Sequence, residues 1–280
     1  MKKNLFFYIT ATVFFLCFIY FPEITLGTNQ DSEQGLALIE NGSYENGLSI
    51  LLESVYYDNN NPDIWNSIGF AYNNLGLYEE ALPPLVNATQ IEPNHSYGWT
   101  NTGWALNELG RYEEAKTALT NATIADSANK FAWSTLGYTF IRLGDSDHAL
   151  MALNRAIEID PDFSDAWNNV GWAYGELQDY DKAINALKNA TRLDVTNGYA
   201  WNNLGRLQYL IGNNLEAMNS LRNATQTEPD FDQGWYNLGN VLYATGRYNE
   251  SKEAYRKAVI LNPDNTIAAE NMKLLEKGFF

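Results

Sequence analysis

The sequence predicts an all-α solenoid built from stacked antiparallel helix pairs. Its tryptophans recur with a fixed period of 34 residues, which indicates tandem copies of one supersecondary unit. After each tryptophan, apolar residues follow in steps of three and four, which place them on one face of a helix. A glycine eleven residues on ends that helix, and in four copies a proline 28 residues on ends a second one. The periodic tryptophans are Trp65, Trp99, Trp133, Trp167, Trp201 and Trp235.

The N-terminal segment carries the features of an export signal. Lys2 and Lys3 precede an uncharged apolar run from Leu5 to Phe21, so we predict a hydrophobic helix within residues 1–27. The length of this run fits both a signal peptide and a membrane anchor. Because the lysines stay in the cytoplasm, either alternative predicts extracytoplasmic repeats, membrane-anchored or secreted. With Cys17 as the only cysteine, no disulfide stabilises them.

Residues 28–61 are predicted to form a degenerate first repeat. Asp31 stands where the periodic tryptophan is expected, yet Gly35, Gly42 and Leu51 keep the pattern of the later copies. Terminal units of a stack have no neighbour to cover one face, so atypical residues are expected there.

Six clear repeats follow the first one. In each repeat, small residues such as Gly69 and Ala81 are expected where two helix backbones approach closely, and the tryptophan fills the space between neighbouring pairs. Pro83 and Pro84 fall inside a second helix, where we expect a local break costing a few kcal/mol. The six repeats comprise residues 62–95, 96–129, 130–163, 164–197, 198–231 and 232–265.

Residues 266–280 are predicted to form a C-terminal capping helix. Ala269 and Met272 fall in phase with the apolar positions of the preceding first helices. The chain then ends in the apolar pair Phe279-Phe280, for which two interpretations stay open: a joint to another copy, or a cap that folds back over the last helix.

The composition argues against several classes of function. A net charge of −16 repels phosphate backbones, so nucleic-acid binding is not expected. Two histidines and one cysteine cannot build a metal cluster or a nucleophile–base couple. We interpret His95 and His148 as solvated turn or helix residues. The sequence therefore predicts no catalytic residue, no metal site and no cofactor, and the protein is not expected to be an enzyme.

The repeat pattern resembles that of the tetratricopeptide repeat family, W-x2-L-G-x2-Y, then A-x3-F, then P. The resemblance covers about residues 62–265 in six copies, and the phase adds residues 28–61 as a seventh. It implies a right-handed superhelix in which the first helices line the concave side and the second helices the convex side. The last copy matches this pattern at Trp235, Leu238, Gly239, Ser251, Tyr255 and Pro263.

This resemblance implies that a ligand binds in the concave groove. Amides two residues after the tryptophans are expected to stack along it and to hold the backbone of an extended peptide. Aromatic residues five or eight positions after the tryptophans add rings, where binding energy concentrates. For both sets the alternative is a purely structural role, with the rings packing as extra core. The groove residues are Asn101, Asn169, Asn203, Asn237, Phe70, Trp104, Tyr138, Trp172, Tyr209 and Tyr243.

A second periodic feature is the glycosylation sequon. Asn-Ala-Thr recurs 22 residues after four of the tryptophans, and its alanine is an in-phase packing residue, which points the asparagine outward. We expect glycans on the convex face, with duplication of one chance sequon as the alternative. The acceptor asparagines are Asn41, Asn87, Asn94, Asn121, Asn189, Asn223 and Asn249.

Two functions of different classes remain after enzymes are set aside. The first is an exported scaffold that binds an extended segment of another protein in the concave groove, tethered to the membrane if the N-terminal segment is uncleaved. The alternative is a structural protein whose copies stack head-to-tail into a surface filament, because such contacts need not close.

Overall fold

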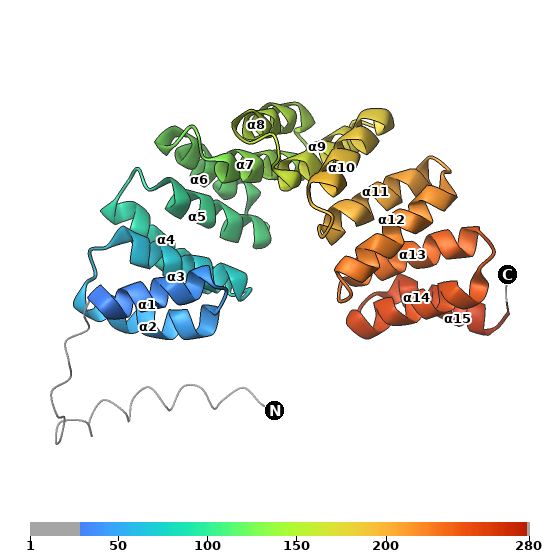
Figure 1. Ribbon diagram of the computed structural model, residues 1–280, viewed down its shortest axis with the longest axis horizontal. Helices are drawn as coiled ribbons and strands as arrows, with labels where there is room; N and C mark the ends of the chain where they lie inside the picture. The colour runs from blue at the N-terminus through green and yellow to red at the C-terminus, as the bar shows by residue number, and fades with distance from the viewer. Residues whose placement is uncertain (1–28, 279–280) are drawn as a thin grey trace, which may run out of the picture. The chain divides into compact units, whose positions relative to one another are not determined.

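The computed structural model describes residues 29–278 as fifteen α-helices, without a β-strand in this range (Figure 1). The predicted all-α class is therefore confirmed. The helices divide between two compact units, which contain residues 29–91 and 92–278 of the described range. The predicted hydrophobic segment 1–27 and the Phe279-Phe280 pair lie outside the described residues. Among residues 29–278, no helix combines the length and the hydrophobicity that a membrane span requires.

The N-terminal unit consists of two helix pairs, and neighbouring pairs are in contact. Helix α1 packs on α2 and α3 packs on α4, while α3 also contacts both helices of the preceding pair. The bounds are α1 Asn29–Glu40, α2 Tyr44–Tyr57, α3 Pro62–Asn74 and α4 Tyr78–Ile91.

The C-terminal unit repeats the same arrangement over five pairs and one closing helix. The first helix of each pair contacts the first helix of the next pair, and α15 packs on α14. The helices are α5 Ser96–Glu108, α6 Tyr112–Ala125, α7 Lys130–Arg142, α8 Ser146–Ile159, α9 Ser164–Glu176, α10 Tyr180–Leu193, α11 Gly198–Leu210, α12 Asn214–Thr227, α13 Asp232–Ala244, α14 Tyr248–Leu261 and α15 Thr266–Glu276.

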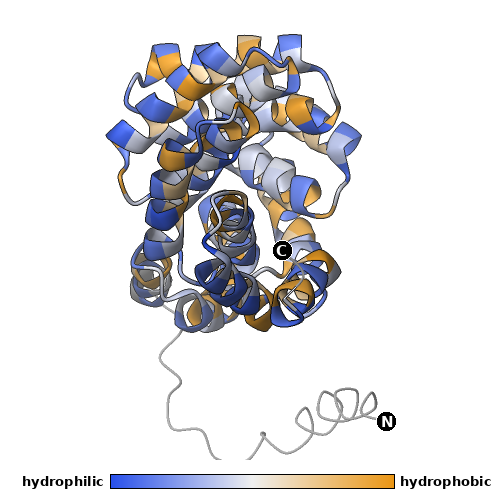
Figure 2. Cartoon of the chain, turned by 90° about the vertical axis from the view of Figure 1, so that its right-hand side faces the viewer, coloured by the Kyte–Doolittle hydropathy of each residue, from blue (hydrophilic) through white to orange (hydrophobic). Residues whose placement is uncertain are grey.

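The helices are amphipathic, and Figure 2 shows hydrophobic and hydrophilic residues on different faces of individual helices. The buried face of α4, α6, α8, α10 and α12 carries alanine, leucine, alanine at intervals of three or four residues. In α8, for example, Ala149, Leu153 and Ala156 are all fully buried. Removing these apolar side chains from water supplies the main driving force for pairing.

Within each pair, the helices meet at a contact between a glycine and a leucine. A Cβ atom added to Gly69 would lie 2.4 Å from Cγ of Leu85, and one added to Gly137 would lie 2.5 Å from Cγ of Leu153. Real Cβ atoms do not approach other atoms this closely, so only glycine fits. The same contact joins Gly35 to Leu51 in the first pair.

The tryptophans fasten the turn that leads into each first helix. The indole nitrogen of each of the six periodic tryptophans donates to the backbone carbonyl six residues earlier. Examples are Trp99 Nε1 to Pro93 O at 2.8 Å and Trp133 Nε1 to Ser127 O at 3.0 Å. These side chains therefore do more than fill the space between neighbouring pairs. The hydrogen bond explains why an aromatic ring with a donor suits this position.

Six of the seven first helices that belong to pairs end in a left-handed glycine, at φ values from 72° to 86°. At the end of α3, the N–H of Leu77 donates to the carbonyl of Tyr72 at 2.9 Å, which satisfies a terminal acceptor. The exception is α9, where Gln178 adopts φ 60°. A side chain in this region costs about 1–2 kcal/mol, and α9 keeps the left-handed position although the predicted glycine is absent there.

The expected break at Pro83 and Pro84 is wrong. Helix α4 continues from Tyr78 to Ile91 through both prolines, and Pro84 is buried. The missing N–H groups would have bonded to the carbonyls of Glu79 and Glu80, which belong to exposed residues of the first turn. Water can hydrogen-bond to these two carbonyls, so α4 stays helical although two of its backbone hydrogen bonds are missing.

The interpretation of His95 as a solvated residue is also wrong. His95 is buried, and its Nδ1 accepts a hydrogen bond of 2.8 Å from the N–H of Gly98, so it caps the start of α5. His148 is accessible, stacks on Phe140, and lies 2.8 Å from a carboxylate oxygen of Asp145. The structure therefore gives both histidines local structural roles.

The glycine contact generates a test within one helix. Gly171→Ala should destabilise the protein by about 1–3 kcal/mol, since its Cβ would meet Leu187 Cγ at 2.5 Å and overpacking forces the helices apart. Gly175→Ala in the same helix meets its nearest neighbour only at 3.8 Å and should stabilise by about 0.5–1 kcal/mol. Urea unfolding followed by circular dichroism measures both. Equal effects of the two substitutions would contradict the proposed contact.

Candidate functional site

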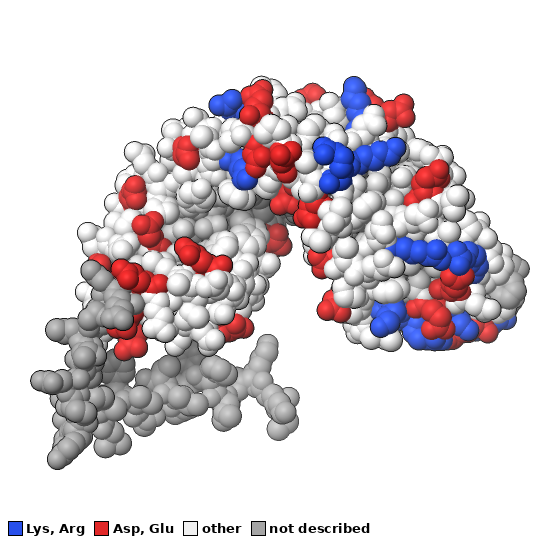
Figure 3. Space-filling view, in the orientation of Figure 1, with Lys and Arg blue, Asp and Glu red and all other residues white. Residues whose placement is uncertain are grey.

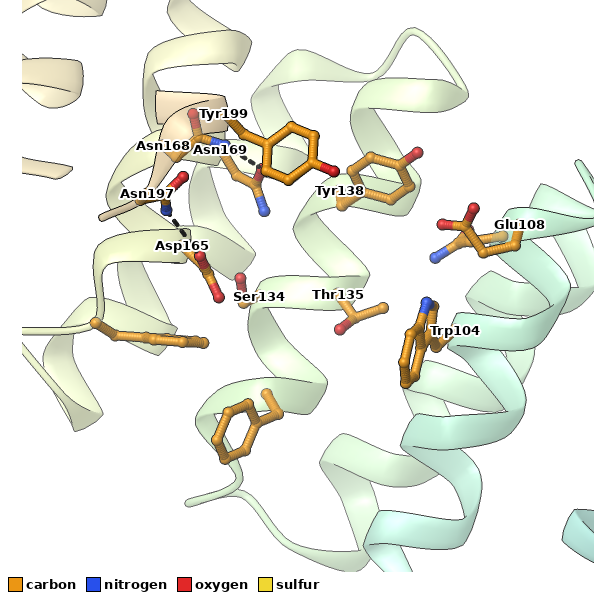
Figure 4. A pocket seen from close by; sticks show the side chains of 13 residues that line it. Trp104, Glu108, Ser134, Thr135, Tyr138, Asp165, Asn168, Asn169, Asn197 and Tyr199 are labelled. Carbon is orange, nitrogen blue, oxygen red and sulfur yellow. Dashed lines mark hydrogen bonds between the residues drawn. The ribbon is translucent and has the colours of Figure 1, made fainter. Parts of the chain in front are cut away.

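A cavity of about 420 Å³ opens along the first helices of four consecutive repeats in the C-terminal unit (Figure 4). Helices α5, α7, α9 and α11 contribute its walls, in agreement with the expected location of a groove on the first helices. The walls combine aromatic rings, amides, small hydroxyls and two carboxylates. The lining residues are Trp104, Asn107, Glu108, Phe131, Ser134, Thr135, Tyr138, Phe163, Asp165, Asn168, Asn169, Asn197 and Tyr199.

Tyr138 occupies the middle of the aromatic wall and is held on two sides. Its ring lies 5.7 Å from that of Trp172 in an edge contact, and Arg142 donates to its hydroxyl at 2.8 Å. Burial raises the pKa of Tyr138, although the hydrogen bond from Arg142 opposes this rise. The phenol is therefore neutral at physiological pH, and its ring has a fixed orientation.

Phe131 and Phe163 form a second aromatic contact at the edge of the cavity. Their ring centroids are 5.3 Å apart, and the ammonium of Lys130 lies 5.1 and 4.9 Å from them. Lys130 also pairs with Asp160, and this hydrogen bond lowers the pKa of the Asp160 carboxyl. The two rings thus already bind one cation, the Lys130 ammonium, because the face of an aromatic ring is electronegative.

Asp165 supplies an accessible negative charge to the cavity, and Figure 4 shows its carboxylate beside Asn197. Asp165 Oδ1 accepts a hydrogen bond of 3.2 Å from Asn197 Nδ2. Desolvation by the surrounding protein raises the pKa of Asp165, and the nearby charge of Asp194 raises it further. The carboxylate is therefore accessible to a ligand, and its ionised form is less favourable than that of an isolated aspartate.

The expected row of binding amides divides into two kinds. Asn169 lines the cavity. Asn203 instead donates to Asn168 of the preceding repeat at 2.9 Å, and Asn237 donates to Asn202 at 2.8 Å. These last two amides join neighbouring repeats, so part of their hydrogen-bonding capacity is used inside the protein.

Asn101 has a different position. It lies half-buried on α5 and does not line the cavity. The structure thus places one of the four predicted amides at the cavity, while the proposed binding role of the set stays a prediction.

The predicted aromatic residues are likewise distributed over several places. Trp104 and Tyr138 line the cavity. Trp172 packs behind Tyr138 against a buried cluster, and its Nε1 donates to Glu176 at 3.0 Å. Phe70 belongs to the N-terminal unit, where its ring lies 6.1 Å from Tyr44.

Tyr209 and Tyr243 meet in a separate, smaller cavity of about 230 Å³ near the C-terminal end. Tyr255 forms its floor and donates to Asn240 Oδ1 at 2.8 Å. Burial raises the pKa of Tyr255 to about 12, so its hydroxyl stays a hydrogen-bond donor. This side chain replaces the leucine that meets the glycine in the other pairs, which explains the polar character of this end.

The repeated Asn-Ala-Thr sequons have a packing explanation. In all four, the alanine is fully buried, and the threonines Thr89, Thr123, Thr191 and Thr225 are at most 6% exposed. Their hydroxyls donate to backbone carbonyls of the preceding turn. The asparagines Asn87, Asn121, Asn189 and Asn223 are half-buried within helices, whereas Asn41, Asn94 and Asn249 are exposed.

Several cavity residues were not identified from the sequence. Phe131 and Tyr199 stand two residues before a tryptophan, and Phe163 stands four before one, so all three lie where a first helix begins. Aromatic residues recur at these positions relative to the tryptophan, but the positions lie N-terminal to those expected to line the groove. Asp165 and Glu108 carry only a weak periodic signal, because each has a counterpart in a single other repeat, Asp63 and Glu176 respectively.

The fold and the cavity define a repeat scaffold with a concave surface of amides and rings. Family profiles described as Tetratricopeptide repeat match residues 62–95, 97–129, 132–163, 152–185 and 232–265. The chain belongs to the tetratricopeptide repeat family. No curated protein sequence matches it. Proteins of this fold are generally non-catalytic scaffolds suited to protein–protein interaction.

Solved structures share the fold at low sequence identity. A chain of the APC/C hetero-tetramer Cut9-Hcn1 superposes with a TM-score of 0.76 at 18% identity; the match covers 86% of this chain but only 48% of that one. A tetratricopeptide repeat protein from Parabacteroides merdae gives 0.69 at 15% identity, covering 89% and 99%. TTC0263 from Thermus thermophilus gives 0.57 at 22% identity, covering 65% and 99%.

The two kinds of amide make different predictions for stability. Asn237→Ala removes the donor to Asn202, leaving a buried acceptor without this partner, and should cost about 1–3 kcal/mol of unfolding free energy. Asn169→Ala at the cavity wall should change it by less than about 0.5 kcal/mol. Urea titration of both variants tests this difference. A large loss for Asn169→Ala would assign it a structural role instead.

Proposed function

We propose that the protein is an extracytoplasmic scaffold that binds an extended segment of another protein along its first helices. The observation that supports this proposal is the cavity on α5, α7, α9 and α11. Rings such as Trp104 and Tyr138 supply apolar contact area there, while Asn169 offers a donor and an acceptor to a peptide backbone. A peptide in an extended conformation can make both kinds of contact.

The extent of the cavity across four first helices favours a peptide segment over a small molecule as the ligand. The cavity follows four successive helices, so a ligand lying along it crosses several repeats. An extended chain advances about 3.3 Å per residue, so side chains along the peptide contact different helices of the cavity. Rigid helices position these walls in advance, which lowers the entropy lost on binding.

The groove can be tested by selecting peptides from a displayed random library on the immobilised full-length protein. Trp104→Ala combined with Asn169→Ala should weaken the binding of selected peptides by more than about tenfold, because both ring and amide contacts are lost. Tyr97→Ala on α5 is the matched control, since this exposed ring does not line the cavity. Calorimetric titration measures the affinities, and circular dichroism confirms the fold.

Two results would contradict the groove proposal. One is equal binding by the wild type and the double variant. The other is a concentration-dependent series of assemblies in light scattering that the same double variant leaves unchanged. The latter would favour the alternative, head-to-tail self-assembly.

The extracytoplasmic location rests on the basic and apolar character of residues 1–27. If the repeats are exported in an organism that glycosylates proteins, Asn41 is the favoured acceptor, because it is exposed and Ser43 of its sequon is only partly buried, whereas the serine or threonine of every other sequon is buried. Protease added to intact cells should therefore digest the repeats, and the intact mass should show sugar increments that Asn41→Gln reduces. Protection from protease in intact cells would refute the location.

A further inference from the structure

The cavity on α5, α7, α9 and α11 carries a charge of one sign. Its wall contains two carboxylates, Glu108 and Asp165, and none of the described residues that line it is Lys or Arg. Glu108 comes from α5 and Asp165 from α9, with the Ser134 and Thr135 hydroxyls of α7 between them (Figure 4). A ligand group that reaches the middle of the cavity therefore has a carboxylate on each side.

The carboxylate of Asp165 retains capacity to bind. Its Oδ1 accepts from Asn197, while Oδ2 has no hydrogen-bond partner among the residues that the structure describes. Crowding by the surrounding protein and the charge of Asp194 make ionisation of Asp165 less favourable. A cation placed beside it relieves both effects.

The nearby cations of the protein are occupied elsewhere. Lys130 is paired with Asp160 and lies against Phe131 and Phe163. Arg142 stacks on Tyr112, with 4.6 Å from its guanidinium carbon to the ring centroid, and donates to the Tyr138 hydroxyl. Neither is paired with Glu108 or Asp165 by a salt bridge within the described part of the chain. These two cations therefore form no direct pair with the carboxylates, although the charge of Lys130 opposes the rise in the pKa of Asp165.

The aromatic walls suit the remainder of a long basic side chain. Lys and Arg have apolar stems that pack on apolar surface while the charged group reaches a polar site. Trp104 and Tyr138 offer ring faces for the stem, and a cation near such a face gains further attraction. The contact of Lys130 with Phe131 and Phe163 shows this interaction at the same cavity edge.

The charge of the N-terminal unit has the same sign. Residues 29–91 contain no Lys or Arg, and Figure 3 shows only acidic charged side chains on the visible face of α1–α4. Such a distribution attracts a basic partner and speeds its association. The carboxylates in this unit are Asp31, Glu33, Glu40, Glu45, Glu53, Asp58, Asp63, Glu79 and Glu80.

Building on the proposed function, we infer that the bound segment is basic and inserts a Lys or Arg side chain into this cavity, with its charge between Glu108 and Asp165. The rings hold its aliphatic stem, and Asn169 contacts the neighbouring backbone. Specificity then has two sources. The rings accept many apolar groups, whereas the carboxylates reject acidic ones by repulsion.

The test uses the peptide selection described above and reads the sequences recovered. The wild-type protein should enrich peptides with Lys or Arg at one fixed position. A selected peptide should bind about tenfold more tightly than its analogue with norleucine at that position, because norleucine keeps the stem and removes the charge. In Glu108→Gln with Asp165→Asn this preference should disappear, while affinity for the norleucine analogue stays unchanged.

The control is Asp230→Asn with Glu270→Gln, which changes the net charge equally at exposed positions that do not line the cavity. It should keep the preference for Lys or Arg. Enrichment of peptides without any basic preference would overturn the inference but leave the groove function standing. An equal loss in both double variants would assign the effect to overall charge and also overturn it. Recovery of no peptide by the wild type would contradict the proposed function itself, together with this inference.

Discussion

The close approach of the two helices in each pair is the constraint on which the other contacts depend. A glycine on the first helix and a leucine on the second meet in every pair from Gly35 and Leu51 to Gly205 and Leu221, and in the last pair Tyr255 takes the place of the leucine. Since the backbone distance is set there, the buried alanines of the second helix come into contact on either side. The first helices are thereby held at a repeated spacing, which allows side chains from α5, α7, α9 and α11 to share one cavity.

Contacts between repeats add a polar layer to this apolar arrangement. Asn203 with Asn168 and Asn237 with Asn202 link consecutive first helices through amides. Deeper in the unit, Asn107 and Thr139 exchange hydrogen bonds across the same kind of boundary. Buried amides require partners with specific geometry, so these contacts fix the register between repeats more strictly than leucine contacts alone. Asn169 takes no part in these contacts between repeats; it accepts a hydrogen bond of 3.4 Å from Asn168 of its own helix and lines the cavity.

The sequence was most informative where a signal recurs in every repeat. The tryptophan period, the glycine on the first helix and the apolar phase of the second helix sufficed for the all-α class and for locating the helix pairs. They were insufficient for side chains that recur in only a few of the repeats. Asp165 joins the cavity because α9 lies beside α7 in three dimensions, a relation that spacing along the chain does not express. Local rules also failed at Pro83, whose missing backbone hydrogen bond falls in the exposed first turn of α4, and at Gln178, which adopts a left-handed conformation without being a glycine.

The indole hydrogen bond has a consequence for how such a chain is assembled over evolutionary time. Each bond closes between a tryptophan and the carbonyl six positions upstream, as in Trp201 with Val195, so donor and acceptor both travel within one short stretch of sequence. The acceptor is a backbone carbonyl at the end of the preceding repeat, which a residue of any type supplies, so a duplicated repeat needs no matching side chain in its new neighbour. Adding or removing a repeat thus preserves the hydrogen-bonded turn between helix pairs. Substitutions can then accumulate in the side chains that differ between copies.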